Sequence, residues 1–212
     1  MMRICEIFAS IQGESTYAGL PCTFVRMTGC NLRCKYCDTT YAYDEGSEMT
    51  ADEIIHAVRC YGLNLVEITG GEPLLQRDAG SLISRLLDSN FKVLIETNGS
   101  VDIGGVDRRA TIIMDVKTPG SGMSDSVRIE NLALLKKSDE LKFVITDEVD
   151  YDWARAMVRQ FKLSEKCTIL FSPIYGKISP SGLSTWIIAD KLPVRMNLQL
   201  HKYIFGPDRR GV

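Results

Sequence analysis

The chain has 212 residues, of which 45% are hydrophobic and 25% carry a charge, and its formal net charge is −2 at pH 7. This composition is typical of a globular protein, and the length fits one domain covering residues 1–212. The nearly balanced charge gives no indication of a nucleic-acid-binding surface, and no apolar run is long enough to span a membrane. We therefore expect neither a nucleic acid nor a membrane as a partner.

The chain contains 7 cysteines, an odd number, and several of them lie on one short stretch. This distribution does not suit a disulfide framework, and Met1–Phe8 alternates like a strand without the apolar core of a signal peptide. We expect reduced cysteines and a cytoplasmic location. Cys5, Cys22, Cys60 and Cys167 are interpreted as small apolar residues, because free cysteine is among the most buried residue types.

In chain order, short runs rich in Val, Ile, Leu and Phe alternate with amphipathic segments. The runs predict strands buried on both faces, and the segments between them predict helices. Ala51–Tyr61 is the clearest helix, because Thr50 and Glu53 have the spacing of a capping box. The predicted strands are Cys22–Thr28, Leu65–Thr69, Lys92–Thr97, Thr111–Lys117, Leu141–Thr146, Thr168–Ser172 and Met196–Leu200, and the other predicted helices are Ala79–Ser89, Ile129–Lys136, Trp153–Phe161 and Leu183–Asp190.

Strands that alternate with helices indicate an α/β fold with a parallel sheet and right-handed crossovers. The carboxyl ends of parallel strands form the active-site face in such folds, so the loops that follow the strands should converge on one cleft. A complete eight-fold barrel needs about 250 residues, so we predict a partial, open TIM-like barrel. The unusual loops are the cysteine-rich stretch, Gly70–Pro73, Asn98–Gly99, Pro119–Gly122, Ser172–Gly176 and His201–Lys202.

Cys30, Cys34 and Cys37 have the spacing C-x3-C-x2-C, which places three thiols on one loop and supplies no fourth. Structural zinc sites and electron-transfer clusters normally use four protein ligands, whereas a [4Fe-4S] cluster held by three cysteines leaves one iron open. This spacing is the hallmark of radical S-adenosylmethionine (SAM) enzymes, in which SAM chelates that iron. Two alternatives stay open: a zinc site completed by Cys60, His56 or Cys167, and ordinary reduced core thiols.

Gly70-Gly71-Glu72-Pro73 follows the next predicted strand. Two glycines allow the backbone to approach a ligand closely, and Pro73 stiffens the turn, so this turn can hydrogen-bond the methionine part of SAM. Alone the motif also fits an ordinary strand-to-helix turn. Behind C-x3-C-x2-C and a capped helix it indicates radical SAM chemistry.

Several further segments resemble the 7-carboxy-7-deazaguanine synthase family of the queuosine pathway, and the resemblance runs from about Ile7 to the end of the chain. Its most specific parts precede and follow the cysteines, as Ile11-Gln12-Gly13-Glu14 and Cys37-Asp38-Thr39. The other matching segments are Phe24-Val25-Arg26, Thr69-Gly70-Gly71-Glu72-Pro73, Glu96-Thr97-Asn98-Gly99, Asp115-Val116-Lys117 and Gln199-Leu200-His201-Lys202.

The resemblance implies a radical SAM barrel reduced in helices and a lyase that contracts 6-carboxy-5,6,7,8-tetrahydropterin to 7-carboxy-7-deazaguanine with loss of ammonia. It also implies a [4Fe-4S] cluster, SAM as a catalytic cofactor, Mg²⁺, a homodimer, and an electron donor such as flavodoxin or ferredoxin. The cluster would be held by Cys30, Cys34 and Cys37, and SAM by Tyr36, Cys37, Asp38, Gly71, Glu72, Asp115, Val116, Lys117, Ser172, Pro173, Ile174 and Tyr175.

The implied substrate-binding residues are Ile11, Gln12, Gly13, Glu14, Arg26, Thr69, His201 and Pro207. Their chemistry is compatible, because Glu14 can accept from the N–H edge of a pterin and Arg26 can hold the substrate carboxylate in a bidentate fork. Thr39 supplies a hard oxygen for Mg²⁺.

Each assignment has a structural competitor. Arg26 could only pair with a neighbouring acid, Thr39 could cap the loop, and His201 could be a satisfied imidazole at a strand end. His56 is interpreted as structural.

Two features depart from the family pattern. Ser15 stands where relatives often have a second glycine, and the chain continues past Pro207 to Val212, whereas some relatives end near the proline and use that end against the substrate.

Two other functions fit part of this pattern. A glycyl-radical-activating enzyme also uses C-x3-C-x2-C, but it would not explain Gln12 and Glu14, and Asp38-Thr39 replaces the continuation common there. A zinc-binding interaction module would be colourless, whereas a cluster protein is brown.

Overall fold

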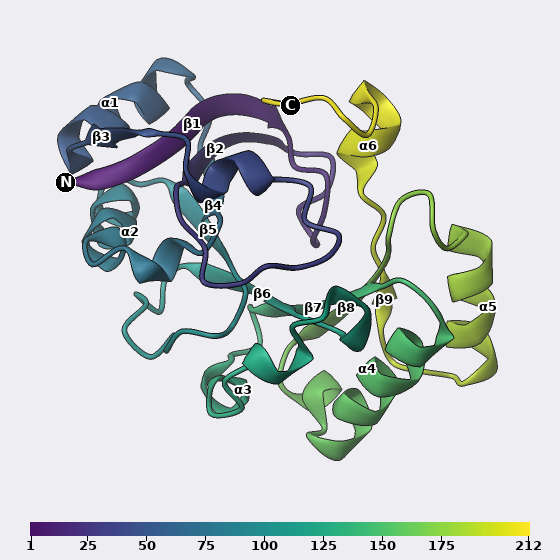
Figure 1. Ribbon diagram of the computed structural model, residues 1–212. Helices are drawn as coiled ribbons and strands as arrows, with labels where there is room; N and C mark the ends of the chain where they lie inside the picture. Colours follow the sequence, from purple (N-terminus) through teal and green to yellow (C-terminus); the bar gives the residue numbers. More distant parts are fainter.

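The computed structural model describes residues 1–212 and contains one nine-stranded sheet in the order β3-β1-β2-β4-β5-β6-β7-β8-β9. From β2 to β9 all neighbours are parallel, while β1 pairs antiparallel with both β2 and β3. The edge strands β3 and β9 do not pair with each other, so the curved sheet is an open barrel (Figure 1). The strands are β1 Met2–Ile11, β2 Pro21–Met27, β3 Ser47–Met49, β4 Leu65–Gly70, β5 Lys92–Thr97, β6 Thr111–Val116, β7 Glu140–Ile145, β8 Thr168–Pro173 and β9 Arg195–Met196.

Six α-helices accompany the sheet. In Figure 1, α1 and α2 lie beside the N-terminal strands, α4 and α5 lie beside β7–β9, and α6 stands near the C-terminus. None of the helices is both long and apolar enough to span a bilayer. The helices are α1 Ala51–Cys60, α2 Ala79–Asp88, α3 Asn131–Leu134, α4 Glu148–Gln160, α5 Pro180–Ala189 and α6 Leu200–Phe205, and the short 3-10 helices are η1 Thr40–Tyr43, η2 Pro73–Leu75, η3 Pro119–Ser121, η4 Ser124–Ser126 and η5 Leu163–Glu165.

The capping box that predicted the first helix is present in the structure. Thr50 caps α1 by accepting from the backbone N–H of Glu53 at 3.3 Å, and the Glu53 carboxylate accepts in return from the backbone N–H of Thr50 at 2.7 Å. The predicted α/β open barrel is confirmed. The first strand is antiparallel to its neighbour, because it reaches β2 through a connection that reverses the chain rather than through a crossover helix.

The predicted strand Met196–Leu200 is wrong. Only Arg195–Met196 forms β9, and Leu200–Phe205 forms α6, so His201 and Lys202 lie on a helix instead of at a strand end. The apolar run there was too short to distinguish a strand from a helix. The predicted helix Ile129–Lys136 shrinks to α3, whereas α4 and α5 begin earlier than predicted, at Glu148 and Pro180.

The main core lies between the sheet and its covering helices. It contains 36 buried residues, including Val66 and Ile68 of β4, Met114 of β6 and Phe143 of β7. The side chains that alternate with these core residues point to the other face of the sheet, which is the inside of the barrel. Glu67, Thr69, Asp115 and Lys142 occupy such positions, so the same strands that build the core also deliver polar groups to the interior.

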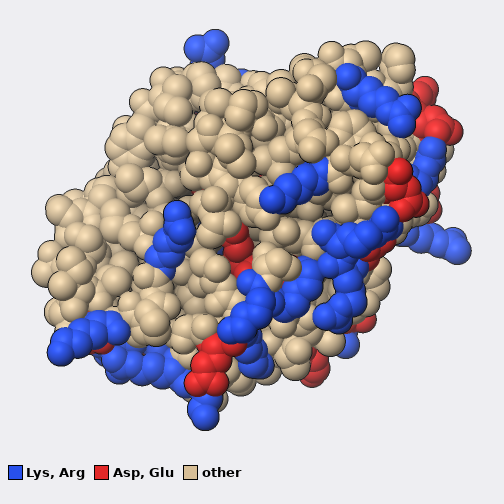
Figure 2. All heavy atoms as spheres, turned by 180° about the vertical axis from the view of Figure 1, so that it is seen from behind, with Lys and Arg blue, Asp and Glu red and all other residues tan.

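The surface carries both signs of charge. Figure 2 shows one face, on which Lys and Arg side chains gather toward one side with Asp and Glu side chains among them. Exposed ion pairs such as Arg85–Asp52 and Arg109–Asp88 fit this mixture, and each contributes little to stability.

Candidate active site

A cavity of about 230 Å³ opens at the carboxyl ends of the parallel strands. Its walls come from β1, β2 and β4–β7, from the loop after β2, and from α6. Five of the six predicted loops contribute to it, whereas Pro119–Gly122 does not line the cavity. The predicted site residues that line the cavity are Ile11, Gln12, Gly13, Glu14, Arg26, Cys30, Cys34, Tyr36, Cys37, Asp38, Thr39, Thr69, Gly71, Asp115, Lys117, Ile174 and His201.

Six predicted site residues do not line it. Glu72 is fully buried behind the wall, where its carboxylate accepts from the hydroxyl of Thr97 at 2.9 Å and the backbone N–H of Asn98 at 2.7 Å, so it ties the loops after β4 and β5 together. Tyr175 is 40% exposed and makes an edge contact with Tyr203. Val116 points into the core, and the hydroxyl of Ser172 is hydrogen-bonded to Asn197. The remaining two are Pro173, which is buried, and Pro207, which is exposed.

The cysteine loop is anchored at several points. Its backbone N–H groups at Gly29 and Lys35 donate to the carbonyls of Ala42 and Ser121 at 2.8 and 3.0 Å. Cys30, Cys34 and Cys37 are free thiols, all partly exposed and all on the cavity wall. Three thiols on one loop beside one cavity are the donor set that a three-cysteine [4Fe-4S] cluster requires.

The other cysteines take no part in this wall. His56 and Cys60 contact each other at 3.9 Å on the exposed side of α1, so His56 is a surface residue rather than a core one. Cys22 and Cys167 are buried as predicted, whereas Cys60 is exposed and Cys5 is partly exposed. None of the three residues considered as a fourth zinc ligand lines the cavity.

Gly71 brings two backbone segments together. A Cβ at this position would collide with the carbonyl oxygen of Gly29 and lie 2.8 Å from the Cβ of Cys30. The next residue, Glu72, donates its backbone N–H to the same Gly29 carbonyl at 2.8 Å. Only glycine leaves room for this approach, so the Gly-Gly turn is packed directly against the cysteine loop.

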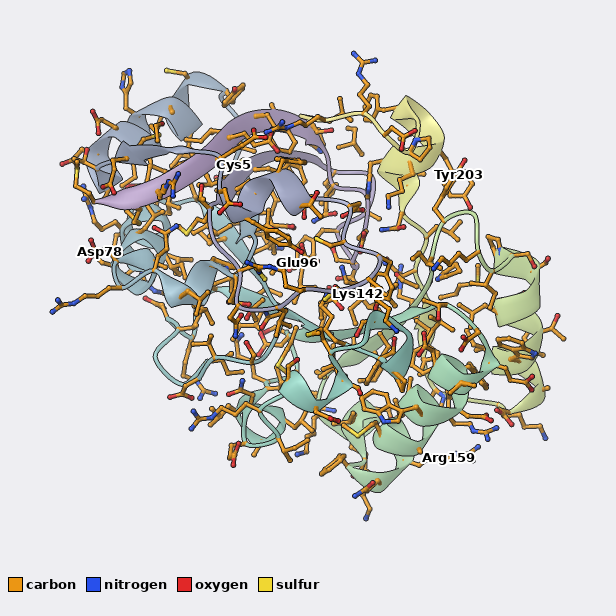
Figure 3. All side chains as sticks on the ribbon, in the orientation of Figure 1. Cys5, Asp78, Glu96, Lys142, Arg159 and Tyr203 are labelled. Atoms are coloured by element: carbon orange, nitrogen blue, oxygen red, sulfur yellow. The ribbon has the colours of Figure 1, made fainter.

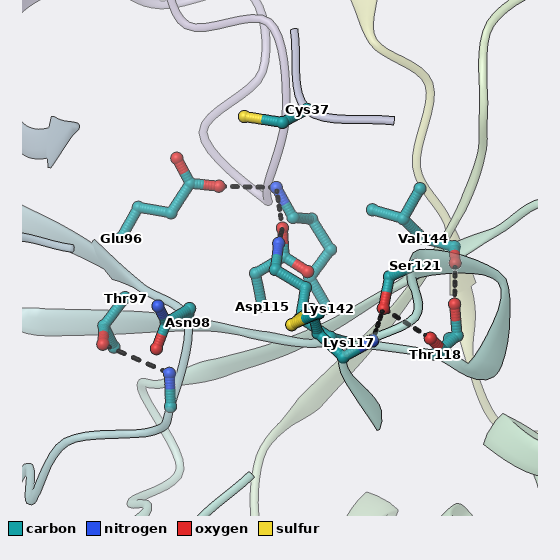
Figure 4. A network of polar contacts seen from close by, with 12 residues as sticks. Cys37, Glu96, Thr97, Asn98, Asp115, Lys117, Thr118, Ser121, Lys142 and Val144 are labelled. Atoms are coloured by element: carbon teal, nitrogen blue, oxygen red, sulfur yellow. Dashed lines mark hydrogen bonds and ion pairs between the residues drawn. The ribbon is translucent and has the colours of Figure 1, made fainter. Parts of the chain in front are cut away.

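A chain of ion pairs crosses the floor of the cavity (Figure 4). Lys142 lies 2.7 Å from Glu14, 2.5 Å from Glu96 and 3.3 Å from Asp115, and Lys117 lies 3.0 Å from Asp115. In Figure 3 the labelled Glu96 and Lys142 are in the middle of the molecule. Although burial opposes it, the ammonium of Lys142 lowers the pKa of Glu96 to about 2, so Glu96 is ionised at neutral pH.

Two polar atoms near this floor have no partner in the protein, namely Oδ1 of Asp115 and the hydroxyl of Tyr36. Both residues line the cavity beside the cysteines. Buried polar atoms are normally hydrogen-bonded, so these two are available to a bound ligand with hydrogen-bonding groups. The hydroxyls and ammonium of SAM are such groups.

Another part of the wall holds a second set of polar contacts. The Gln12 amide nitrogen donates to Glu67, and its oxygen accepts from the backbone N–H of Glu14 at 2.7 Å. Arg26 Nε donates to Glu6 at 2.7 Å, and Glu6 also accepts from the hydroxyl of Tyr41 at 2.9 Å.

Arg26 thus pairs with an acid and also lines the cavity. Since only Nε faces Glu6, its terminal nitrogens are free to meet a ligand.

Helix α6 closes this side. The backbone N–H of Leu200 donates to the carbonyl of Gly13 at 2.7 Å, and a Cβ on Gly13 would collide with the ring of His201. Lys202 pairs with Asp38 at 2.7 Å, which joins the helix to the cysteine loop. Burial lowers the pKa of His201, so its imidazole is neutral at pH 7. Val212, at the end of the chain, lines the cavity as well.

Comparisons with known proteins agree with this geometry. Residues 24–118 match the model of the Radical SAM superfamily. The 7-carboxy-7-deazaguanine synthase of Chlorobaculum tepidum is 47% identical over 100% of this chain and 97% of its own length. The one from Koribacter versatilis is 46% identical over 100% of both chains.

The chain belongs to the 7-carboxy-7-deazaguanine synthase family. The crystal structure of QueE from Escherichia coli has the same fold, with a TM-score of 0.78, 21% identity and 94% coverage of both chains. Streptococcus suis SuiB bound to its precursor peptide shares the barrel with a TM-score of 0.59 and 17% identity, over 82% of this chain and 47% of that one. The family assignment leaves no basis for the glycyl-radical-activating and zinc-module alternatives.

As a member of the family, this chain is a radical SAM enzyme that uses a [4Fe-4S] cluster and SAM. The three thiols, the close approach at Gly71 and the unpaired atoms of Tyr36 and Asp115 fit those two groups.

Three ionisable residues of the floor, Glu67, Glu96 and Lys142, were not predicted as site residues from the sequence. A signal for them existed, because each is a charged residue inside an apolar strand run, where an ionised side chain is normally excluded unless it faces a polar interior.

Proposed function

We propose that this enzyme contracts 6-carboxy-5,6,7,8-tetrahydropterin to 7-carboxy-7-deazaguanine and releases ammonia. One observation carries the proposal: one side formed by the cysteine loop and another formed by Gln12, Glu14 and Arg26 line a single cavity. The first side suits a radical-generating cofactor, and the second suits a small ring system with an N–H edge and a carboxylate.

The cluster and SAM would supply radical chemistry when bound. The protein must hold both molecules, orient them and exclude water. We propose that Cys30, Cys34 and Cys37 hold the cluster and that the residues around Tyr36, Asp38, Gly71, Asp115, Lys117 and Ile174 hold SAM. Glu72 would act from behind the wall, by fixing the loops after β4 and β5.

The substrate would lie in the cavity against Arg26 of β2 and Gln12, which directly follows β1. Glu14 accepts from the N–H edge of the pterin ring, Gln12 offers a donor and an acceptor, and Arg26 holds the carboxylate with its terminal nitrogens. Ile11, Gly13, Thr69 and His201 complete the wall. Val212 lines the cavity whereas Pro207 is exposed, which supports Val212 over Pro207 as the proposed substrate contact.

Thr39 is proposed as the protein ligand of Mg²⁺. Its hydroxyl lies 3.8 Å from Sγ of Cys37, and Thr39 lines the cavity, so its oxygen would be available to a metal there. Mg²⁺ commonly takes one or two protein oxygens and completes its octahedron with ligand and water oxygens.

We also propose a compartment, a domain organisation, an oligomeric state and an electron donor for this enzyme. All 7 cysteines are free, which supports a reducing compartment such as the cytoplasm. The continuous sheet supports one domain for residues 1–212. A homodimer and a flavodoxin or ferredoxin as electron donor follow from the family resemblance.

Anaerobic incubation of the reconstituted enzyme with SAM, dithionite and the carboxytetrahydropterin tests the function. We expect a product lighter than the substrate by one ammonia, and no product when SAM is omitted. A brown protein that cleaves SAM but leaves the pterin unchanged would overturn the substrate assignment.

A further inference from the structure

We propose that Lys142 is a positioning residue that holds Glu14 in place for the substrate and fixes the distance between the substrate-binding and SAM-binding halves of the cavity. The inference rests on the proposed function, because it concerns how that substrate is held. Lys142 has no role in the sequence motifs from which the site was predicted.

The position of Lys142 is set by the sheet. Residue 142 of β7 is the register partner of Asp115 of β6, and both side chains point into the barrel. On the next strand, Glu96 of β5 extends to the same point. Three neighbouring strands therefore bring one cation and two carboxylates together before any loop contributes.

The third carboxylate comes from a loop. Glu14 lies in the connection after β1, outside regular structure, and its two oxygens accept from Lys142 Nζ at 2.7 Å and from Gln199 Nε2 at 3.0 Å. Gln199 immediately precedes α6, so Lys142 is the only one of the two donors that belongs to the sheet. Without the ammonium, Glu14 would be held only by a segment outside the sheet.

The ammonium of Lys142 is almost fully buried, with a side-chain exposure of 5%. A buried charge is costly unless it is paired and hydrogen-bonded, and an ammonium has three donors. Its three carboxylate partners match those donors in number. The arrangement is thus complete without a ligand, which makes Lys142 a fixed support rather than a group free to bind the substrate itself.

Lys142 also joins the two halves of the cavity. Glu14 is on the pterin side, whereas Asp115 is on the SAM side, where Lys117 holds it independently at 3.0 Å. Loss of Lys142 should therefore release Glu14 and leave Asp115 supported. Loss of Lys117 should leave the Lys142–Glu14 pair intact and take the nearer of two cations from Asp115, which provides a matched control from the residue after β6.

The experiment measures the binding of each ligand separately to the reconstituted holoenzyme without reductant, so that no turnover occurs. Lys142→Met should weaken carboxytetrahydropterin binding by roughly 30-fold or more, the range for removing one partner of a buried charged pair, and SAM binding by less than about threefold. Lys117→Met should show the opposite preference. Lys142→Arg, which keeps the charge, should recover part of the lost pterin affinity.

A second readout follows under turnover. If Lys142 sets the distance between the two ligands, Lys142→Met should form more 5'-deoxyadenosine per molecule of deazaguanine product than the wild type. A role in folding alone would lower both products together.

Should Lys142→Met fail to fold, the double variant Lys142→Met with Glu96→Gln removes one of the uncompensated charges, and the same measurements apply to it.

Unchanged pterin affinity, or equal loss of both ligands in a folded variant, would overturn the inference. Failure of the wild type to bind the pterin would instead overturn the proposed function, so the two failures are distinguishable.

Discussion

The side-chain amide of Gln12 donates to the carboxyl group of Glu67, and both residues are 3% exposed. Together with the bond from the backbone of Glu14, this contact fixes which end of the amide is nitrogen and which is oxygen. The amide of Gln12 is therefore held in one orientation, with a known donor end and a known acceptor end, on the substrate side of the cavity.

Glu67 should make the stability of the protein depend on pH. Burial, assisted by the charge of Glu96, raises the pKa of Glu67 well above its usual range. Because the folded state then holds the proton more tightly than the unfolded chain, this contribution is complete below the pKa of an unfolded glutamate and is lost as pH rises through the folded-state pKa. Glu67→Gln keeps the accepting oxygen and removes the titration.

We therefore expect the unfolding free energy of Glu67→Gln to fall less steeply between pH 5 and pH 8, by at most about 1.4 kcal/mol per pH unit. Chemical denaturation over this range measures it, with the exposed Glu48→Gln as control. Parallel curves for Glu67→Gln and the wild type would show that Glu67 is ionised in the folded protein.

Each cysteine of the loop should be essential for the cluster and dispensable for the fold. Replacing Cys30, Cys34 or Cys37 by Ala removes one of three thiolates from a loop that backbone hydrogen bonds hold independently. We expect loss of bound iron and of SAM cleavage with an unchanged circular dichroism spectrum. Cys60→Ala and Cys167→Ala should retain their iron, and loss of iron in either would reveal a fourth protein ligand.

Gly71→Ala should disturb the cofactor side selectively. The added methyl group would collide with the backbone of Gly29, which cannot rotate away as a side chain could. Overpacking of this kind costs roughly 1–3 kcal/mol, and here it would displace the cysteine loop. We expect lower iron content and weaker SAM binding, whereas Gly105→Ala, which meets no atom within 4 Å, should match the wild type.

Arg26→Ala should weaken substrate binding by roughly 2–4 kcal/mol, since it removes the proposed carboxylate anchor. SAM binding should barely change. Titration of the holoenzyme with each ligand measures both effects, and Glu6→Gln, which retains a partner for Nε, serves as control for the ion pair alone. Wild-type pterin affinity in Arg26→Ala would place the anchor elsewhere.

Thr39→Val keeps the shape of the side chain and removes its oxygen. If Thr39 holds Mg²⁺, the dependence of turnover on added Mg²⁺ should be lost or shifted to higher concentrations, while SAM binding persists. The measurement is a Mg²⁺ titration of turnover at saturating substrate. A Mg²⁺ response identical to that of the wild type would mean that Thr39 only supports the loop.

The barrel and the cofactor side could be predicted because their signals are local. Apolar runs of the right length marked most of the parallel strands, and a three-cysteine spacing depends on one loop. The charged floor could not be predicted in the same way, because Lys142 meets Glu14 across 128 residues and Glu96 across 46. Only the register of the sheet brings such residues together.

The end of the chain shows the limit most clearly. A short apolar run near Met196 fits a strand and a helix equally well, so the sequence led to the wrong element at β9 and α6. The structure does explain why relatives often have a glycine at the position of Ser15. Its φ of 66° lies in the left-handed region, where a glycine would be favoured over a residue with a Cβ.

The last residues also affect how the protein should be handled. Arg210 stacks on Tyr41 at 3.5 Å and pairs with Glu45, which carries the chain back so that Val212 reaches the cavity wall. A purification tag fused after Val212 would begin at the mouth of the active site and compete with ligands for that space. A tag at Met1, whose amine pairs with the exposed Asp78, would begin outside the cavity, so affinities should be measured on protein tagged there.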